Sequence, residues 1–184
     1  MDLWLEFLGY YLSEGGAETG STISISQRQG VKAIKIKKCL LNLSKILGAS
    51  LTEIKDEKYV WFKITNTQLS EFLKINAPGK DDTKKCFLNL SSFSEKQLKI
   101  LYDSMLLGDG SKDGKSYGST SLDLVNLFQS ISCLINKSAN LQLHYPKNYR
   151  GTRKPMYRVS LSNQTELFVN KKSIKKVNYS GKVF

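Results

Sequence analysis

The sequence contains no apolar run long enough to span a bilayer. Its first residues, MDLWLEF, lack the basic stretch and the small-residue cleavage site of a secretory signal. We therefore expect a protein that has no membrane partner and is not secreted, with the cytoplasm or the nucleus as its default location.

Cysteine is scarce. The three cysteines, Cys39, Cys86 and Cys133, lie far apart, and no CxxC motif or Cys/His cluster accompanies them. An odd, dispersed set of this kind indicates neither a disulfide framework nor a zinc site. Cys39 and Cys133 lie in apolar, helix-like stretches, so we expect small buried thiols there.

Positive charge is abundant. Lys and Arg total 28 against 16 Asp and Glu, which gives a formal net charge of +12. This surplus favours an anionic polymer as partner, although ribosomal proteins, heparin binders and membrane-surface proteins share it. The basic residues are spread along the chain, which is unlike a disordered basic tail. A hydrophobic fraction of 40% permits a packed core.

Two segments of the chain repeat one pattern. Phe7–Gly15 reads FLGYYLSEG and Tyr102–Gly110 reads YDSMLLGDG, and each is predicted to end a helix with an acidic residue and a glycine. A glycine at this position suits a left-handed helix end. The second helix has a predicted start at Ser94, with Gln97 completing a capping box.

The segments that follow the two motifs also match. Both halves are predicted to run helix, strand, helix, strand, strand, and the two acidic residues are 95 positions apart (109 − 14). The pattern predicts an α+β fold of two pseudo-symmetric halves. The predicted elements are strands 22–26, 50–54 and 59–65 with helices 31–47 and 68–74, then strands 115–120, 139–144 and 156–162 with helix 121–135.

Domain boundaries follow from this repeat. Residues 1–92 would form the first half and residues 93–170 the second. The linker would start at about residue 76, because Pro78-Gly79 and the charged run Lys80–Lys85 are typical of a connection. Residues 171–184 would form a basic tail.

Small residues recur on both predicted motif helices. Gly9 and Ser13 are four apart, as are Ser104 and Gly108, so each pair shares one helix face and lets two backbones approach closely. If these faces pack together, the carboxylates of the two helix ends lie side by side. Two such carboxylates repel each other at the negative ends of helix dipoles, and a divalent cation would relieve the conflict. Mg²⁺ beside a basic surface suits phosphodiester hydrolysis.

The two segments resemble the two copies of the LAGLIDADG signature in double-motif homing endonucleases of inteins and introns. The resemblance covers roughly residues 1–170. It implies Glu14 and Asp109 as catalytic, metal-binding acids, with the glycines that follow them, Gly15 and Gly110, at the metal site. It also implies Gly9, Ser13, Ser104 and Gly108 as the helix interface. The chain departs from the signature at Leu12 and Leu107, where the family often has Asp.

This resemblance implies two αββαββα-like halves, with the motif helices at the centre and antiparallel saddle sheets along the DNA major groove. It implies a monomeric pseudo-dimer that binds double-stranded DNA and uses Mg²⁺, with Mn²⁺ or Ca²⁺ able to substitute for binding. Family members often place a lysine near each active site. Lys63 and Lys154 are the candidates, and Lys147 competes with Lys154.

Polar faces of the predicted strands supply the DNA-contact candidates, since hydroxyl, amide and basic groups contact bases and phosphates. An exposed polar face is also ordinary for an antiparallel sheet. The lone histidine, His144, is predicted on such a face rather than as a catalytic base. The candidates are Ser24, Ser26, Arg28, Lys63, Thr65, Gln142, His144, Arg150, Arg153, Lys154, Arg158 and Ser160.

Three functions remain open at this point. The leading prediction is a site-specific homing endonuclease, located in the cytoplasm, an organelle or the nucleus with its target. The alternative is a catalytically inactive LAGLIDADG-fold nucleic-acid-binding protein, such as an RNA maturase or a DNA-binding regulator. The third is a generic basic α+β binding domain. The tail VNYSGKVF resembles a strand near the splicing region of inteins, but the final His-Asn pair is absent, so we predict no splicing.

Overall fold

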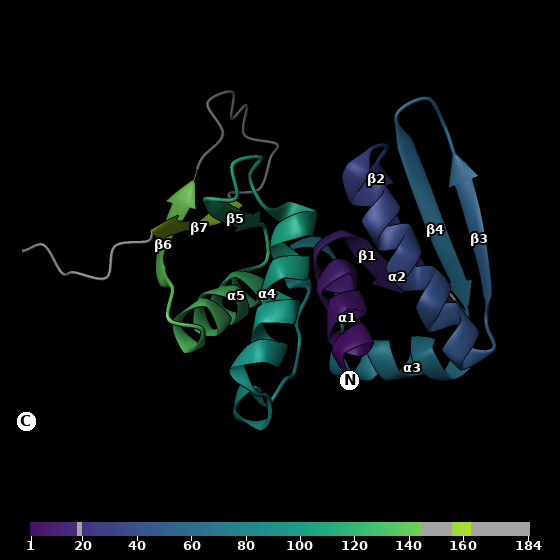
Figure 1. Ribbon diagram of the computed structural model, residues 1–184, viewed down its shortest axis with the longest axis horizontal. Coiled ribbons are helices and arrows are strands. Elements are labelled where there is room, and N and C mark those ends of the chain that lie inside the picture. The colour runs from purple at the N-terminus through teal and green to yellow at the C-terminus, as the bar shows by residue number, and fades with distance from the viewer. Residues whose placement is uncertain (18–19, 145–155, 163–184) are drawn as a thin grey trace, which may run out of the picture.

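A computed structural model describes residues 1–17, 20–144 and 156–162 of the chain. It has two halves that lie side by side, and each contributes one helix to the centre (Figure 1). The first half consists of α1 (Asp2–Glu14), β1 (Gly15–Ala17), β2 (Thr22–Arg28), α2 (Val31–Leu47), β3 (Ser50–Lys55), β4 (Tyr59–Thr65) and α3 (Thr67–Asn76).

A connecting segment with two short 3₁₀ turns, η1 (Asp81–Thr83) and η2 (Leu90–Ser92), leads to the second half. The described part of that half consists of α4 (Glu95–Asp109), β5 (Ser116–Ser119), α5 (Leu122–Leu134), β6 (Ser138–His144) and β7 (Met156–Ser162). The predicted α+β fold of two halves around central motif helices is confirmed.

Both sheets are antiparallel and have corresponding strand orders, β1-β2-β4-β3 and β5-β7-β6. In the first half β1 begins the sheet, with Gly15 paired to Ile25 of β2. In the second half an isolated bridge between Gly110 and Tyr117 of β5 stands at the same place. The register therefore makes Tyr117 the structural counterpart of Ile25.

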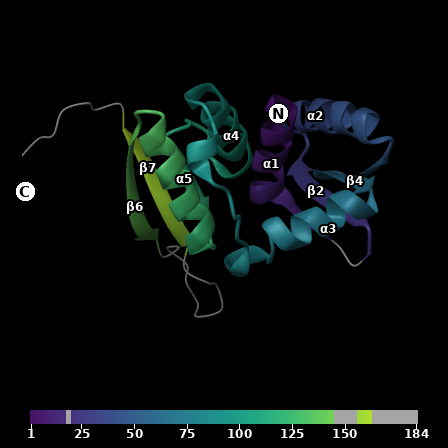
Figure 2. The same ribbon diagram turned by 90° about the horizontal axis from the view of Figure 1, so that it is seen from below.

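Each sheet buries one face under helices and leaves the other face open. In β4, Val60, Phe62 and Ile64 are buried, whereas the residues between them point to the opposite face. The helix α2 packs on the first sheet and α5 packs on the second (Figure 2). This alternation is that of half-buried antiparallel strands, as the sequence predicted. No helix among the described residues is long and apolar enough to cross a membrane.

Helix starts follow the sequence more closely than helix ends. Ser94 and Gln97 form the predicted capping box of α4, and the Ser121 hydroxyl caps α5 by accepting from the Leu124 N–H. The predicted left-handed ends at Gly15 and Gly110 are wrong, because both residues are extended and the chain runs directly into its next sheet contact.

A glycine is needed after each motif acid because a side chain there would collide with the last turn of the preceding helix, not because the backbone is left-handed. A Cβ at Gly15 would lie 2.8 Å from the Tyr11 Cα, and one at Gly110 would lie 2.1 Å from the Leu106 carbonyl oxygen. The predicted burial of cysteine holds for Cys39 but is wrong for Cys133, which is exposed on the outer side of α5.

Candidate active site at the ends of the central helices

The two central helices meet through the small residues of their motifs. A Cβ added at Gly9 would lie 2.0 Å from the Ser104 Oγ, and one at Gly108 would lie 2.5 Å from the Ser13 Cβ. The Ser13 hydroxyl crosses between the helices and donates to the Met105 carbonyl oxygen at 3.1 Å. The structure thus brings the four small residues together in two reciprocal contacts, Gly9 with Ser104 and Ser13 with Gly108.

This packing places Glu14 and Asp109 beside each other at the C-terminal ends of α1 and α4. The position of a Cβ on Gly108, next to Asp109, is 3.3 Å from the Glu14 Cγ. Both carboxylates line one cavity of about 670 Å³. Its walls come from both halves and from the connecting segment, and include Ser24, Ser26, Trp61, Lys84, Ser119 and Met156.

The two carboxylates disfavour each other's charge. Burial raises the pKa of Asp109 to about 8, and the negative charge of Glu14 adds to this shift. Burial also raises the pKa of Glu14, against a hydrogen bond from the Gln27 side chain at 2.9 Å and the charges of two lysines. The pair therefore needs positive charge to be ionised together.

Two lysines from elsewhere in the chain supply positive charge. Neither α1 nor α4 has a basic residue in its last turn, although the C-terminal end of a helix is electronegative. The Lys32 ammonium, from the start of α2, donates to the Gly108 carbonyl oxygen at the end of α4, at 3.2 Å. The Lys84 ammonium, from the connecting segment, donates to the Tyr11 and Gly15 carbonyl oxygens at the end of α1.

Lys84 is the only charged side chain that is fully buried in the described part of the chain, with 4% of its surface exposed. Its ammonium lies 4.5 Å from the centroid of the Tyr11 ring, a cation–π distance. Burial lowers the pKa of Lys84 to about 8, against the nearby charges of Asp109 and Glu14. The carbonyl oxygens of Tyr11 and Gly15 thus accept hydrogen bonds from the Lys84 ammonium, which remains close to both acids.

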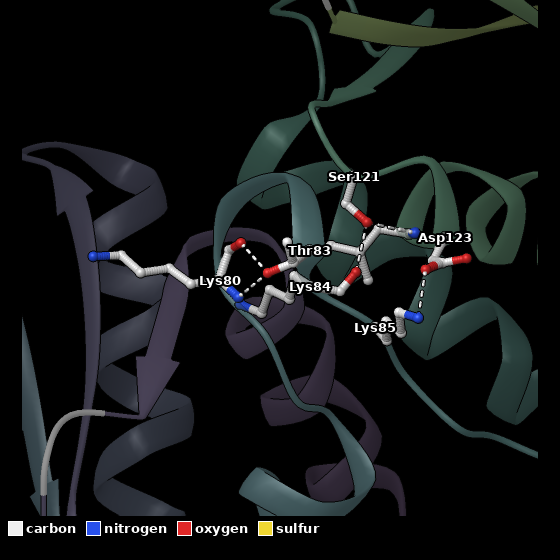
Figure 3. Close-up of polar contacts among 7 residues, drawn as sticks. Lys80, Thr83, Lys84, Lys85, Ser121 and Asp123 are labelled. Carbon is white, nitrogen blue, oxygen red and sulfur yellow. Dashed lines mark hydrogen bonds and ion pairs between the residues drawn. The ribbon is translucent and has the colours of Figure 1, made fainter. Parts of the chain in front are cut away.

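The backbone of Lys84 is anchored to the other half (Figure 3). Its carbonyl oxygen accepts a hydrogen bond from the buried Ser121 hydroxyl at the start of α5. The Thr83 hydroxyl donates to the Lys80 carbonyl oxygen at 2.8 Å and closes the turn before Lys84. Lys85, the next residue, lies 3.8 Å from Asp123 of α5 across an exposed surface. The connecting segment therefore contacts α1 through one side chain and α5 through the same residue's backbone.

Three polar residues of this site were not predicted from the sequence: Gln27, Lys32 and Lys84. Lys84 lies in the charged run that was predicted to be a linker, and its place at the end of α1 depends on packing of that segment. Lys63, one of the two predicted catalytic lysines, lies on β4 opposite Ser24 and Thr52 and is not among the residues that line the cavity. The other, Lys154, lies outside the described residues, as does Lys147.

The donors at the helix ends fit a hard divalent cation. Glu14 and Asp109 offer carboxylate oxygens, and the adjacent backbone offers the carbonyl oxygens of Gly15 and Gly108, which hold lysine ammonium groups in this structure. Among the described residues no cluster of three or more His, Cys, Asp or Glu side chains could hold a metal. Mg²⁺ suits such a set, because it commonly takes one or two carboxylates and completes its shell with water and phosphate oxygens.

The open sheet faces carry the described DNA-contact candidates. In the first sheet, cross-strand pairing places Ser24 beside Lys63, Ser26 beside Trp61 and Arg28 beside Tyr59. In the second sheet it places Arg158 beside Gln142 and Ser160 beside Asn140. Each group lies on the face opposite the buried residues. Thr65 continues the open face of β4, and His144 lies at the end of β6, where the backbone alone is described. The candidates Arg150, Arg153 and Lys154 lie outside the described residues.

No family model and no curated protein matches the sequence. Solved structures do match the fold. The complex of I-DmoI with DNA and calcium superposes with a TM-score of 0.61 at 13% identity, over 88% of this chain and 83% of that one. Mesophilic variants of the homing endonuclease I-DmoI give 0.61 at 11% identity, over 88% and 89%.

The N-terminal LAGLIDADG domain of DUF199/WhiA superposes with a TM-score of 0.56 at 12% identity, over 88% of this chain and 76% of that one. I-DmoI and this domain both have the LAGLIDADG fold. At these identities the similarity is one of fold, and the chain therefore has the LAGLIDADG fold with two halves in a single polypeptide.

Proposed function

We propose that this protein is a site-specific DNA endonuclease of the homing type, which hydrolyses both strands of a long duplex target with a divalent metal. The observation that carries the proposal is the pair Glu14 and Asp109. These two acids, one from each half, meet at the ends of the central helices and line one cavity beneath two polar sheet faces. Structures of I-DmoI with DNA and with calcium, manganese or magnesium support the same partner and the same class of metal.

Glu14 and Asp109 would hold the metal through their carboxylate oxygens, because both line the same cavity. When bound, a divalent cation neutralises the scissile phosphate and makes water a stronger nucleophile at neutral pH. Three polar side chains position the two acids and the helix ends that carry them. Gln27 orients the Glu14 carboxylate, and Lys32 and Lys84 hold the two helix ends and reduce the repulsion between the acids.

DNA would lie across the open faces of both sheets, so that each half contacts one side of the target. The net charge of +12 supports binding to the phosphate backbone. Serine, lysine and arginine side chains on the two faces would contribute contacts to phosphates and base edges. A single chain with two halves fits a monomer that acts on a target without exact two-fold symmetry.

The test is cleavage of a randomised duplex library in Mg²⁺ by the wild-type protein, Glu14→Gln and Asp109→Asn. We expect the wild type to select and cut one long site, and either substitution to lower the rate of double-strand cleavage by at least about 100-fold. The matched control is Asp103→Asn, which removes an exposed acid on the same helix as Asp109 and should cut like the wild type.

The same assay distinguishes the alternative function. A catalytically inactive binding protein would select one sequence and bind it equally well after metal is removed, without cutting it. A generic basic domain would bind polyanions without selecting a sequence. Either result would contradict the endonuclease proposal.

A further inference from the structure

The connecting segment between the two halves forms part of the wall of the candidate active site. Its residues Gly79, Lys80, Asp81 and Lys84 line the same cavity as the two motif acids. Residues on the open faces of both sheets line this cavity as well. A duplex that lies across these faces would therefore pass the connecting segment at the level of the two acids.

The charged side chains of the cavity differ in how they could meet a phosphate. Three of the lining residues are acids, Glu14, Asp81 and Asp109, and two are lysines, Lys80 and Lys84. Lys84 is buried, and its ammonium donates to two backbone carbonyl oxygens at the end of α1. Lys80 is exposed, so it is the one basic side chain open to solvent among the described residues that line the cavity. A phosphate that enters beside the acids would thus be repelled by them and attracted by Lys80.

Lys80 lies in a turn with a restrained backbone. Gly79 has a φ of 90°, and a Cβ there would lie 2.1 Å from the Thr83 carbonyl oxygen. Asp81 has a φ of 51°, which is unfavourable for a residue with a side chain. The Lys80 N–H donates to the Thr83 hydroxyl at 3.1 Å, and this hydroxyl donates to the Lys80 carbonyl oxygen at 2.8 Å. Such backbone conformations persist where surrounding contacts maintain them, and they are common where proteins hold ligands.

The turn is attached to both halves of the molecule. The Lys84 side chain holds the end of α1, and its backbone carbonyl oxygen accepts a hydrogen bond from the Ser121 hydroxyl at the start of α5. The Lys85 N–H donates to the Pro78 carbonyl oxygen at 2.8 Å and closes the base of the loop. The Lys80 side chain extends away from this turn (Figure 3). The backbone of Lys80 is therefore fixed beside the acids, while its charged end extends outward.

We propose that the connecting segment is a third DNA-binding surface beside the two sheets, and that the Lys80 ammonium binds a backbone phosphate of the target next to the cleavage positions. A lysine acts there as a point charge, so the contact contributes affinity for every sequence. Because the phosphate is bound alike before and during the reaction, the contact strengthens binding and leaves the chemical step unchanged. This inference rests on the proposed function, since it assigns a further contact to the same duplex.

The test is Lys80→Gln, with binding measured in Ca²⁺ on the duplex that the wild type selects by binding from the randomised library. We expect binding to weaken about 5-fold and the log–log salt dependence to fall by about one unit, the effect of one phosphate contact. Lys80→Arg should keep most of the affinity, because it keeps the charge. Lys85→Gln is the matched control. It removes the same charge from an exposed residue of the same segment that does not line the cavity, so its affinity should change by less than about 2-fold.

Neutral phosphate analogues locate the contact. A series of duplexes carries a single methylphosphonate at successive backbone positions around the centre of the selected site, and each duplex lacks the negative charge of that phosphate. We expect one or two adjacent positions at which the analogue weakens wild-type binding about 5-fold but weakens binding by Lys80→Gln less than about 2-fold, because the variant has already lost the contact. At phosphates bound by the sheets, both proteins should lose affinity equally.

Cleavage kinetics separate a phosphate contact from a catalytic lysine. Lys80→Gln should raise KM for the duplex about 5-fold and leave kcat for each strand unchanged. A lower kcat for one strand, with unchanged affinity, would refute the proposed contact. Equal losses for the wild type and Lys80→Gln at every methylphosphonate position would refute it as well.

The two proposals fail separately. If the wild type binds one sequence without cutting it, the endonuclease is refuted, while a methylphosphonate position to which Lys80→Gln alone is insensitive still supports the contact. If the wild type cuts and Lys80→Gln binds as tightly as Lys85→Gln, the contact is refuted and the endonuclease stands. If the wild type binds no duplex, both proposals are refuted.

Discussion

In the first half a four-stranded sheet ends beside Glu14, whereas the described second half has three strands beside Asp109. The helix contacts at the centre are reciprocal, but the surroundings of the two carboxylates are not. Glu14 accepts a hydrogen bond from the Gln27 side chain, while burial and the negative charge of Glu14 raise the pKa of Asp109 to about 8. A duplicated fold can thus keep its packing symmetric and still make its two acids chemically unequal.

The symmetric part of this comparison is the contact between α1 and α4, which is made by Gly9, Ser13, Ser104 and Gly108. Substitutions in this contact should have the largest effects. We expect Gly9→Ala and Gly108→Ala each to lower the free energy of unfolding by about 3 kcal/mol, because the added Cβ would lie 2.0 Å from the Ser104 Oγ or 2.5 Å from the Ser13 Cβ. Urea denaturation measures the effect. Gly16→Ala is the control, since a Cβ there meets no atom within 4 Å and should change stability by less than about 0.5 kcal/mol. An equal change in the free energy of unfolding for all three variants would contradict the close contact between α1 and α4.

The sequence predicts the contact between α1 and α4 better than it predicts the residues around the two carboxylates. Small residues four apart, strand alternation and the Ser94 capping box are local patterns, and they predicted the central helices, the sheets and the two acids. Lys84 and Lys32 could not be predicted in the same way. Lys84 reaches the site only through the fold of the connecting segment, and Lys32 reaches the end of α4 from the start of α2 in the other half.

The errors have physical causes as well. An acid followed by glycine at a helix end is compatible with both left-handed and extended backbones, and the sheet contact that decides between them is not local. Cys133 lies in a helix with apolar residues on more than one side, so composition alone did not identify its exposed position.

The unequal carboxylates should appear as a pH dependence of the metal-free protein. A folded pKa of about 8 for Asp109, above its ordinary value of 3.8, means that the folded state holds a proton that the unfolded state releases. The resulting stability is fully present below pH 3.8 and is lost as pH rises through 8. We expect unfolding experiments between pH 4 and 8 to show a loss on the order of 3 kcal/mol.

Two variants test whether this slope belongs to Asp109. Asp109→Asn should remove most of it, whereas Glu14→Gln should remove less, because Gln27 and the two lysines already favour the Glu14 carboxylate. Added Ca²⁺ should reduce the slope in the wild type, since metal binding replaces the proton. A slope that survives Asp109→Asn would mean that another group is responsible.

The connecting segment tests whether one residue serves both halves. Lys84→Met removes the ammonium that holds the end of α1 and keeps a side chain of similar length, so we expect a loss of about 2 kcal/mol in stability and slower cleavage of both strands. Its neighbour supplies the control, because Lys85 is half exposed and its 3.8 Å contact with Asp123 should contribute less than about 0.5 kcal/mol. If Lys84→Met and Lys85→Met behave alike, Lys84 does not support the site.

The sheet faces offer the smallest effects and compare the halves as DNA-binding surfaces. In the first sheet β4 places Lys63 beside Ser24 and Thr52, while in the second sheet β7 places Arg158 beside Gly118 and Gln142. Because a lysine acts as a point charge and an arginine can pair with guanine through two hydrogen bonds, the two residues should respond differently to substitution. Lys63→Gln should weaken binding by about 1 kcal/mol for all sequences and lower the salt dependence by about one unit of log–log slope. Arg158→Gln should instead relax base preference within one half-site, measured by selection from the randomised library. If Lys63→Gln changed base preference and Arg158→Gln changed only the salt dependence, the roles assigned to the two faces would be reversed.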